Sequence, residues 1–192
     1  MTLQVGIGKI PDAVVGVIGS AGFKDLGVQT ELYSDGFMFL QEKGIITNKM
    51  KKINTGYSTT SLIMGSKKLY DYVHMRSQVQ MRPCMYTNSA EKVRDCAPFL
   101  AVNTAIGVDL SGITLTASAY DGVVIVTEYG IADLRDLPTG FKGLALASIS
   151  HPNYRDMLMK TFYNDPMMTK PKGFSLDKIP PGVILYNGKT TV

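Results

Sequence analysis

Glu31 is the carboxylate in this chain whose surroundings suggest covalent chemistry. It lies in a β-prone run, 27–32, that stops at the turn Ser34-Asp35-Gly36. A strand end with two glycines, Gly6-Ile7-Gly8, lies upstream. The carboxyl ends of neighbouring strands in an open α/β sheet face one crevice, where ligands bind. A carboxylate in such a crevice can attack a carbonyl carbon, with backbone N–H groups stabilising the oxyanion. The alternative is a surface carboxylate at a strand end.

The elements that must position Glu31 alternate along the chain. The residue pattern predicts strands at 3–7, 27–32, 44–47, 58–64, 78–82, 99–110 and 123–127. Helices are expected from Pro11 to Ile18, over 36–43 with Gly44 as its cap residue, over 67–72, and over 139–149 and 152–164. Such alternation favours an α/β fold with an open, largely parallel sheet and flanking helices. We expect one domain over 1–164. The proline-rich residues 165–192 are expected to form an extended tail.

Composition narrows the class of protein. The chain has 192 residues, 45% of them hydrophobic, which is enough for an ordinary core. The net charge of the chain is +4, and its lysines cluster only mildly. No nucleic-acid-binding motif accompanies these lysines, so no nucleic-acid partner is expected. No apolar run approaches the length of a membrane span, so no membrane partner is expected either.

The cysteines and histidines do not form a recognisable metal site. Cys84 and Cys96 fit no metal or redox spacing, and free thiols suit a reducing compartment. His74 and His151 are far apart in the sequence, so no metal is expected. No targeting signal is visible, and we expect the cytoplasm or the mitochondrial matrix.

Seven blocks in the same order resemble the C-terminal half of the acetyl-CoA hydrolase/transferase family, which includes 4-hydroxybutyrate, butyrate and acetate CoA-transferases. The blocks begin with those around Gly6-Ile7-Gly8 and Glu31. The others are Gly44-Ile45-Ile46-Thr47-Asn48-Lys49, Met64-Gly65-Ser66-Lys67-Lys68-Leu69-Tyr70-Asp71-Tyr72, Asn103-Thr104-Ala105-Ile106-Gly107-Val108-Asp109-Leu110-Ser111-Gly112, Val126-Thr127-Glu128-Tyr129-Gly130-Ile131-Ala132 and Ile149-Ser150-His151-Pro152-Asn153-Tyr154-Arg155. The resemblance implies a sheet of the CoA-transferase type, present here as an incomplete half.

The resemblance also implies a reaction. Members transfer CoA between an acyl-CoA and a free carboxylate such as acetate, through a glutamyl-CoA thioester on the residue that matches Glu31. CoA is then a substrate, no tightly bound cofactor is expected, and a homo-oligomer is expected. CoA-contacting residues of the family match Gly6, Ile7, Gly8, Lys9, Ile10, Asn103 and Ile106. Plainer alternatives are a tight turn for the glycines and an ordinary core strand for Asn103 and Ile106. Glu128 is expected to have a supporting or structural role.

The chain departs from the family pattern in two ways. The N-terminal half of a typical member is absent, and several dozen residues are missing between Gly112 and Ile113, including a glycine-rich loop that helps to bind CoA. A family arginine is also replaced, at about Ala119. Acyl-CoA hydrolysis and an inactive remnant or CoA-binding module are therefore alternatives. We expect this chain alone to have little or no transferase activity.

Overall fold

The computed structural model describes residues 1–110, 114–116, 124–168 and 171–186, and its contacts group them into two compact units. The first unit holds residues 1–104 and the second holds the described residues from 105 onward. Each unit is described by itself below. The missing segment near 112–113 and the replacement at Ala119 fall outside the described residues. None of the described helices is long and apolar enough to cross a membrane.

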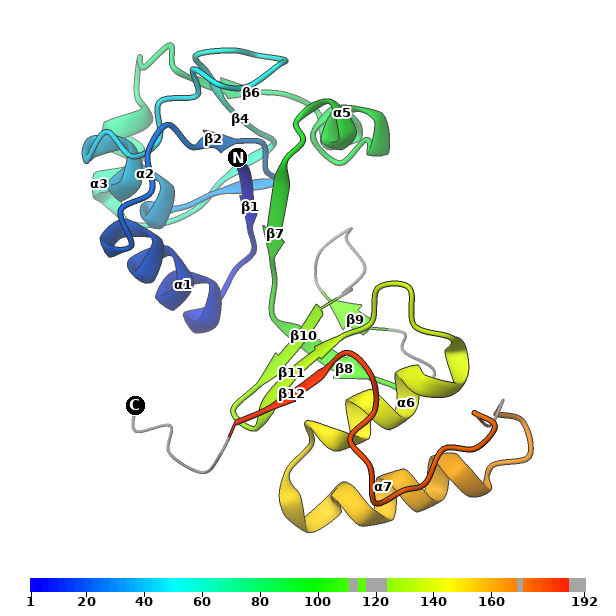
Figure 1. Cartoon of the computed structure of the whole chain (residues 1–192). Helices are drawn as coiled ribbons and strands as arrows, with labels where there is room; N and C mark the ends of the chain where they lie inside the picture. Colours follow the sequence, from blue (N-terminus) through cyan, green and yellow to red (C-terminus); the bar gives the residue numbers. More distant parts are fainter. Residues whose placement is uncertain (111–113, 117–123, 169–170, 187–192) are drawn as a thin grey trace. The chain divides into compact units, whose positions relative to one another are not determined.

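Parallel strand pairs form the centre of the first unit (Figure 1). Its strands are β1 (Thr2–Val5), β2 (Gly27–Val28), β3 (Leu32–Tyr33), β4 (Ser58–Thr60), β5 (Leu62–Ile63), β6 (Val79–Met81) and β7 (Phe99–Val102). Strand β1 lies between β2 and β7. Beyond β2, a parallel bridge from Gln29 to Thr59 and the β3–β5 pair continue the arrangement to β4 and β5, and β6 pairs with β4. The predicted α/β class with a largely parallel sheet is confirmed here.

Helices cover the sheet of the first unit. They are α1 (Lys9–Ser20), α2 (Asp35–Glu42), α3 (Lys67–Val73), α4 (Cys84–Thr87) and α5 (Ala90–Asp95). Val15 of α1, Phe37 of α2 and Leu69 of α3 pack with the strand residues Leu3, Val5 and Val28 in one buried core. Gly44 takes a φ of 69° just after Lys43, the C-cap residue of α2, as a helix-ending glycine does, which confirms the predicted stop.

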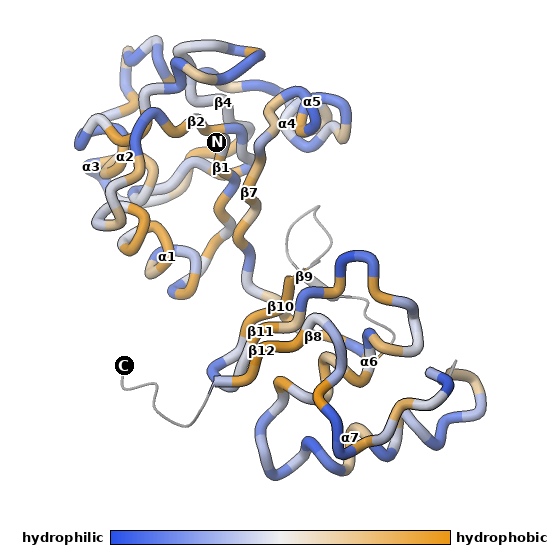
Figure 2. The backbone as a smooth tube through the Cα atoms, viewed as in Figure 1, coloured by the Kyte–Doolittle hydropathy of each residue, from blue (hydrophilic) through white to orange (hydrophobic). Residues whose placement is uncertain are grey.

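The second unit is antiparallel. Its elements are β8 (Ala105–Val108), β9 (Thr114–Thr116), β10 (Val124–Thr127), β11 (Gly130–Asp133), α6 (Thr139–Ser148), α7 (Pro152–Asn164) and β12 (Val183–Leu185). Strand β11 pairs with β10 and β12, and β8 pairs with β9. On α6, Ala145 and Leu146 pack on the sheet, while Leu144 and Ala147 contact Met159 and Phe162 of α7. Figure 2 shows that strands β10, β11 and β12 are coloured largely as hydrophobic.

Two sequence expectations differ from this arrangement. The single strand predicted over 99–110 is wrong, because the chain leaves the first sheet after Val102 and enters a different sheet at Ala105. In the expected tail over 165–192, Val183–Leu185 pairs with β11 and so is part of a sheet. The contacts divide the described residues into two units after residue 104. They do not test the expected boundary at 164, which stays a prediction.

Candidate functional site

Glu31 lies between β2 and β3, and its backbone is held by the neighbouring strand region. The amides of Ser61 and Leu62 donate to the Glu31 carbonyl oxygen at 3.0 and 2.8 Å. The Thr60 hydroxyl donates to the same oxygen at 3.0 Å. These three bonds fix the residue where β3 begins to pair with β5, so the half-buried side chain starts from a rigid backbone.

One amide orients the Glu31 carboxylate. The Asn88 Nδ2 atom donates to Glu31 Oε2 at 2.8 Å. Asn88 follows α4, and its side-chain oxygen accepts from the hydroxyl of the buried Thr87 at 3.3 Å. The Thr87 hydroxyl in turn bonds to that of Ser61. No cation within the described ranges forms an ion pair with Glu31, and the donor that holds its carboxylate, Asn88, is uncharged.

A pocket of about 40 Å³ opens beside this carboxylate. It is lined by the ends of three neighbouring parallel strands, namely β1, the β2–β3 segment and β7. The lining residues are Gln4, Gly6, Ile7, Glu31, Leu32, Asn103 and Thr104. The pocket therefore lies at the carboxyl ends of parallel strands, where open α/β sheets bind ligands.

Gly6 and Asn103 are in close contact at the rim of the pocket. The Gly6 amide donates to the Val102 carbonyl at 2.9 Å, which joins the end of β1 to the end of β7. A Cβ atom on Gly6 would lie 2.5 Å from Asn103 Oδ1, so a glycine is required for this approach. Asn103 and Gln4 exchange two side-chain hydrogen bonds, of 2.9 and 3.1 Å. This amide pair forms one wall of the pocket.

A buried lysine supports the strand that carries Glu31. Lys51 Nζ donates to the carbonyls of Val28 and Tyr57 at 2.7 and 2.8 Å, and to the Thr59 hydroxyl at 3.2 Å. These acceptors lie on both sides of the Gln29–Thr59 bridge. Burial lowers the pKa of Lys51 to about 8, because the charged form loses its hydration.

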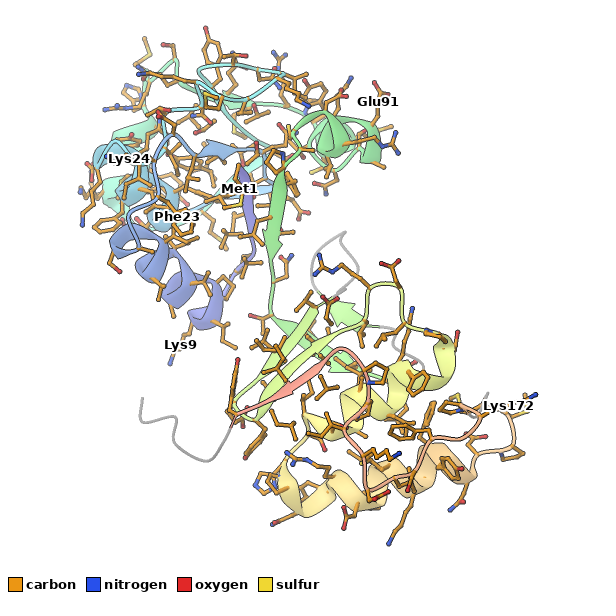
Figure 3. The ribbon with its side chains drawn as sticks, viewed as in Figure 1. Met1, Lys9, Phe23, Lys24, Glu91 and Lys172 are labelled. Atoms are coloured by element: carbon orange, nitrogen blue, oxygen red, sulfur yellow. The ribbon has the colours of Figure 1, made fainter. Side chains whose placement is uncertain are left out.

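The structure brings four of the predicted site residues together. Glu31, Gly6, Ile7 and Asn103 all line the pocket. Gly8 precedes α1 with a φ of 129°, and Lys9 and Ile10 are exposed in the first turn of that helix, outside the pocket lining. Figure 3 shows the Lys9 side chain pointing away from the helix end. Ile106 belongs to β8 in the second unit and is 69% exposed.

Three polar residues of the site were not predicted from the sequence. Gln4 and Thr104 line the pocket, and Asn88 binds the carboxylate. Thr104 follows Asn103 directly, so a pattern of polar residues at a strand end could have indicated it. Gln4 lies inside β1, and Asn88 follows a four-residue helix, where no spacing rule marks a contact with a residue 57 positions away.

The arrangement suits nucleophilic chemistry by a carboxylate. Glu31 offers one oriented oxygen pair at the mouth of a small pocket with an apolar wall of Ile7 and Leu32. A carbonyl carbon of a short acyl group that entered this pocket would meet the carboxylate. No group of three or more metal-binding side chains occurs within the described part of the chain.

The chain is similar to known proteins of one enzyme family. Two segments, residues 65–122 and 113–162, match the model of the acetyl-CoA hydrolase/transferase C-terminal domain. The chain is 31% identical to a butyryl-CoA:acetate CoA-transferase of Anaerostipes caccae, over 82% of this chain and 49% of that protein. It is 25% identical to an acetyl-CoA hydrolase of Schizosaccharomyces pombe, over 83% of this chain and 40% of that protein.

A solved structure shows the same fold. The 4-hydroxybutyrate CoA-transferase of Porphyromonas gingivalis superposes with a TM-score of 0.74 at 31% identity, covering 83% of this chain and 50% of that chain. The chain thus spans about half the length of the relatives that it matches.

Proposed function

Because the chain belongs to the acetyl-CoA hydrolase/transferase family, we propose that its pocket transfers CoA from an acyl-CoA to a free short-chain carboxylate, with Glu31 as the nucleophile. The single observation that supports this assignment is the position of the Glu31 carboxylate. It lines a pocket at the carboxyl ends of three parallel strands and is oriented by Asn88. The activities of the relatives supply the substrate class, an acyl-CoA and a carboxylic acid.

The proposed reaction begins with attack of a Glu31 oxygen on the thioester carbonyl carbon. The carbon–sulfur bond breaks, CoA leaves as a thiolate, and an acyl-glutamyl anhydride remains. The thiolate then attacks the glutamyl carbonyl, which releases the first carboxylate and leaves a glutamyl-CoA thioester. The acceptor carboxylate enters by the same steps in reverse and leaves as the new acyl-CoA. Dividing the transfer in this way replaces one difficult displacement by easier ones. Each covalent intermediate is as activated as the substrate thioester, so the free energy of the thioester bond is passed to the new acyl-CoA.

The hydrogen bond from Asn88 would assist the first step by orientation. A carboxylate held by a donor on one oxygen presents the other oxygen in a fixed direction, which lowers the entropy cost of attack. The rigid backbone of Glu31, held by three hydrogen bonds, supports the same function.

Hydrolysis is the second candidate activity, since an acetyl-CoA hydrolase is among the relatives. In that reaction, water takes the place of the acceptor carboxylate and the products are free CoA and a free acid. Incubation with acetyl-CoA, with and without butyrate, separates the two. A transferase forms butyryl-CoA only when butyrate is present, whereas a hydrolase releases CoA in both cases.

The direct test of Glu31 is chemical trapping. The whole chain is exposed to acetyl-CoA and treated with borohydride, which reduces a glutamyl thioester to an alcohol. Labelling requires only the first half of the reaction, so we expect the mass change on the peptide that contains Glu31 even if the chain alone completes little transfer, and we expect Glu31→Gln to abolish it. Asp12→Asn, which changes a carboxylate in the first turn of α1, is the matched control and should keep the label. A label on another residue, or undiminished labelling of Glu31→Gln, would refute the assignment, and an unlabelled wild type would favour the inactive remnant.

A further inference from the structure

Thr104 carries a buried hydroxyl that has no partner. Its Oγ1 atom is shielded from solvent and forms no hydrogen bond with any described residue. Thr104 lines the pocket together with Glu31 and the Gly6-Ile7 turn. Leaving a buried hydroxyl unbonded costs about 1–3 kcal/mol, so such groups are uncommon and call for an explanation.

The other polar side chains of the pocket already have partners. Gln4 and Asn103 bond to each other, and Glu31 accepts from Asn88. The Thr104 hydroxyl faces the glycine turn, since a Cβ atom on Gly8 would lie 3.6 Å from Thr104 Oγ1. Thr104 thus has an unbonded O–H beside Gly8, next to the pocket that the Thr104 residue lines, and the amide of Asn103, the residue predicted to contact the substrate, is engaged with Gln4.

We propose that the Thr104 hydroxyl donates a hydrogen bond to the carbonyl oxygen of the acyl group that Glu31 attacks. The inference rests on the proposed function. As the glutamyl oxygen bonds to the carbonyl carbon, the π electrons of the carbonyl move onto its oxygen, which becomes an oxyanion. The hydroxyl donates to that oxyanion without transferring its proton. When the oxyanion re-forms the carbonyl, the carbon–sulfur bond breaks and CoA leaves as thiolate.

This role requires a donor close to the charge that develops on the acyl oxygen. Donors fixed in advance in a shielded site stabilise such charge strongly, and loss of one costs about 100- to 1,000-fold in rate. Thr104 follows β7, whose end is bonded to the end of β1, so its backbone is fixed, and rotation about χ1 would turn the shielded hydroxyl from Gly8 toward the pocket. The opposing explanation is a hydroxyl that serves the fold alone, and Thr104→Val separates the two.

The experiment measures the rate of Glu31 labelling from acetyl-CoA at several concentrations, with borohydride trapping at timed intervals. We expect Thr104→Val to lower the maximal rate by about 100-fold, while the half-saturating concentration changes little. Thr104→Ser keeps the hydroxyl and should stay within a few-fold of the wild type. Thr161→Val, at an exposed position on α7, is the control and should label normally. The thermal midpoint of Thr104→Val should stay unchanged or rise, because a methyl group replaces an unbonded hydroxyl.

The outcomes distinguish this inference from the function on which it rests. A wild type that labels at Glu31 together with a Thr104→Val variant that labels at the same rate would overturn the role of Thr104 and leave the proposed function intact. Equal losses in Thr104→Val and Thr104→Ser would also overturn it, since the hydroxyl would then not be the feature that matters. A wild type that never labels would overturn both proposals.

Discussion

Lys51 is a cationic side chain inside the sheet that carries Glu31. It has three hydrogen-bond acceptors, all uncharged, and burial lowers its pKa to about 8. The unfolded chain holds the proton up to a pH near the ordinary lysine value of 10.5. Between these two values the unfolded state binds more protons, so the contribution of Lys51 to stability rises with pH. Below about pH 8, both states are protonated and the full cost of the buried charge remains.

We therefore expect the free energy of unfolding of the wild type to rise relative to Lys51→Met between pH 8 and pH 10. The slope of the difference should be at most about 1.4 kcal/mol per pH unit. Denaturant titrations at several pH values measure it. Both proteins also carry Cys96→Ala, because Cys96 and Lys51 interact electrostatically, and subtraction then removes the opposing effect of Tyr33, whose pKa is raised by burial. Lys160→Met, at an exposed position, is the control, and a flat difference for Lys51→Met would contradict the expectation.

At the residue scale, the sequence was sufficient to predict those site residues that are reactive or conformationally special and that lie at the ends of predicted strands. Glu31 and Gly6 could be placed together because both follow parallel strands, and such strand ends share one edge. Asn88 and Gln4 could not be placed, because their contacts depend on side chains brought together across 57 and 99 positions of the chain. Gly8, Lys9 and Ile10 were predicted to contact CoA and lie outside the pocket lining, so that function stays a prediction for them.

The turn after β1 is the element whose packing most directly shapes the pocket. Gly6→Ala would place a methyl group 2.5 Å from Asn103 Oδ1 and displace the Gln4–Asn103 pair. The backbone of Gly6 is not in the left-handed region, so the cost arises from this contact alone. We expect a loss of about 1–3 kcal/mol in stability, from overpacking, together with slower Glu31 labelling.

Gly16→Ala is the matched substitution for that experiment. Gly16 lies within α1, and a Cβ atom there would have no neighbour within 4 Å. Alanine is favoured over glycine inside a helix by about 0.8–1.0 kcal/mol, so this variant should be more stable than the wild type. Chemical denaturation of both variants checks the pair. A Gly6→Ala protein as stable as the wild type, with normal labelling, would show that the turn tolerates the extra methyl group.

Elements with local signals were predicted well, and elements defined by distant partners were not. The helix expected over 36–43 occurs at Asp35–Glu42, because its glycine stop is a local feature. The helix expected over 152–164 matches α7, which begins with a proline and an N-cap histidine. The strand expected over 99–110 fails because its apolar pattern is continuous, whereas its halves pair in different sheets. Hydrophobic periodicity does not report which sheet a strand joins.

Taken as a whole, the molecule exposes apolar side chains that a larger assembly could cover. On α1, Ile10 and Val17 are 60% and 65% exposed, and Figure 2 shows the hydrophobic colour of this helix. Because one helical face carries both, we expect association of copies of this chain. Light scattering should give a mass of at least twice 20.9 kDa. Val17→Lys should reduce it, and a mass of 20.9 kDa for the wild type at all concentrations would contradict the expected homo-oligomer.

The position of β1 in the first unit has a consequence for folding during translation. β1 lies between β2 and β7, and β7 is encoded about a hundred codons after β1. The edge of β1 that pairs with β7 therefore stays unpaired until Phe99–Val102 leaves the exit tunnel. Contacts so remote in sequence slow folding. During translation, this unpaired edge is the feature of the nascent chain that a chaperone would have to protect.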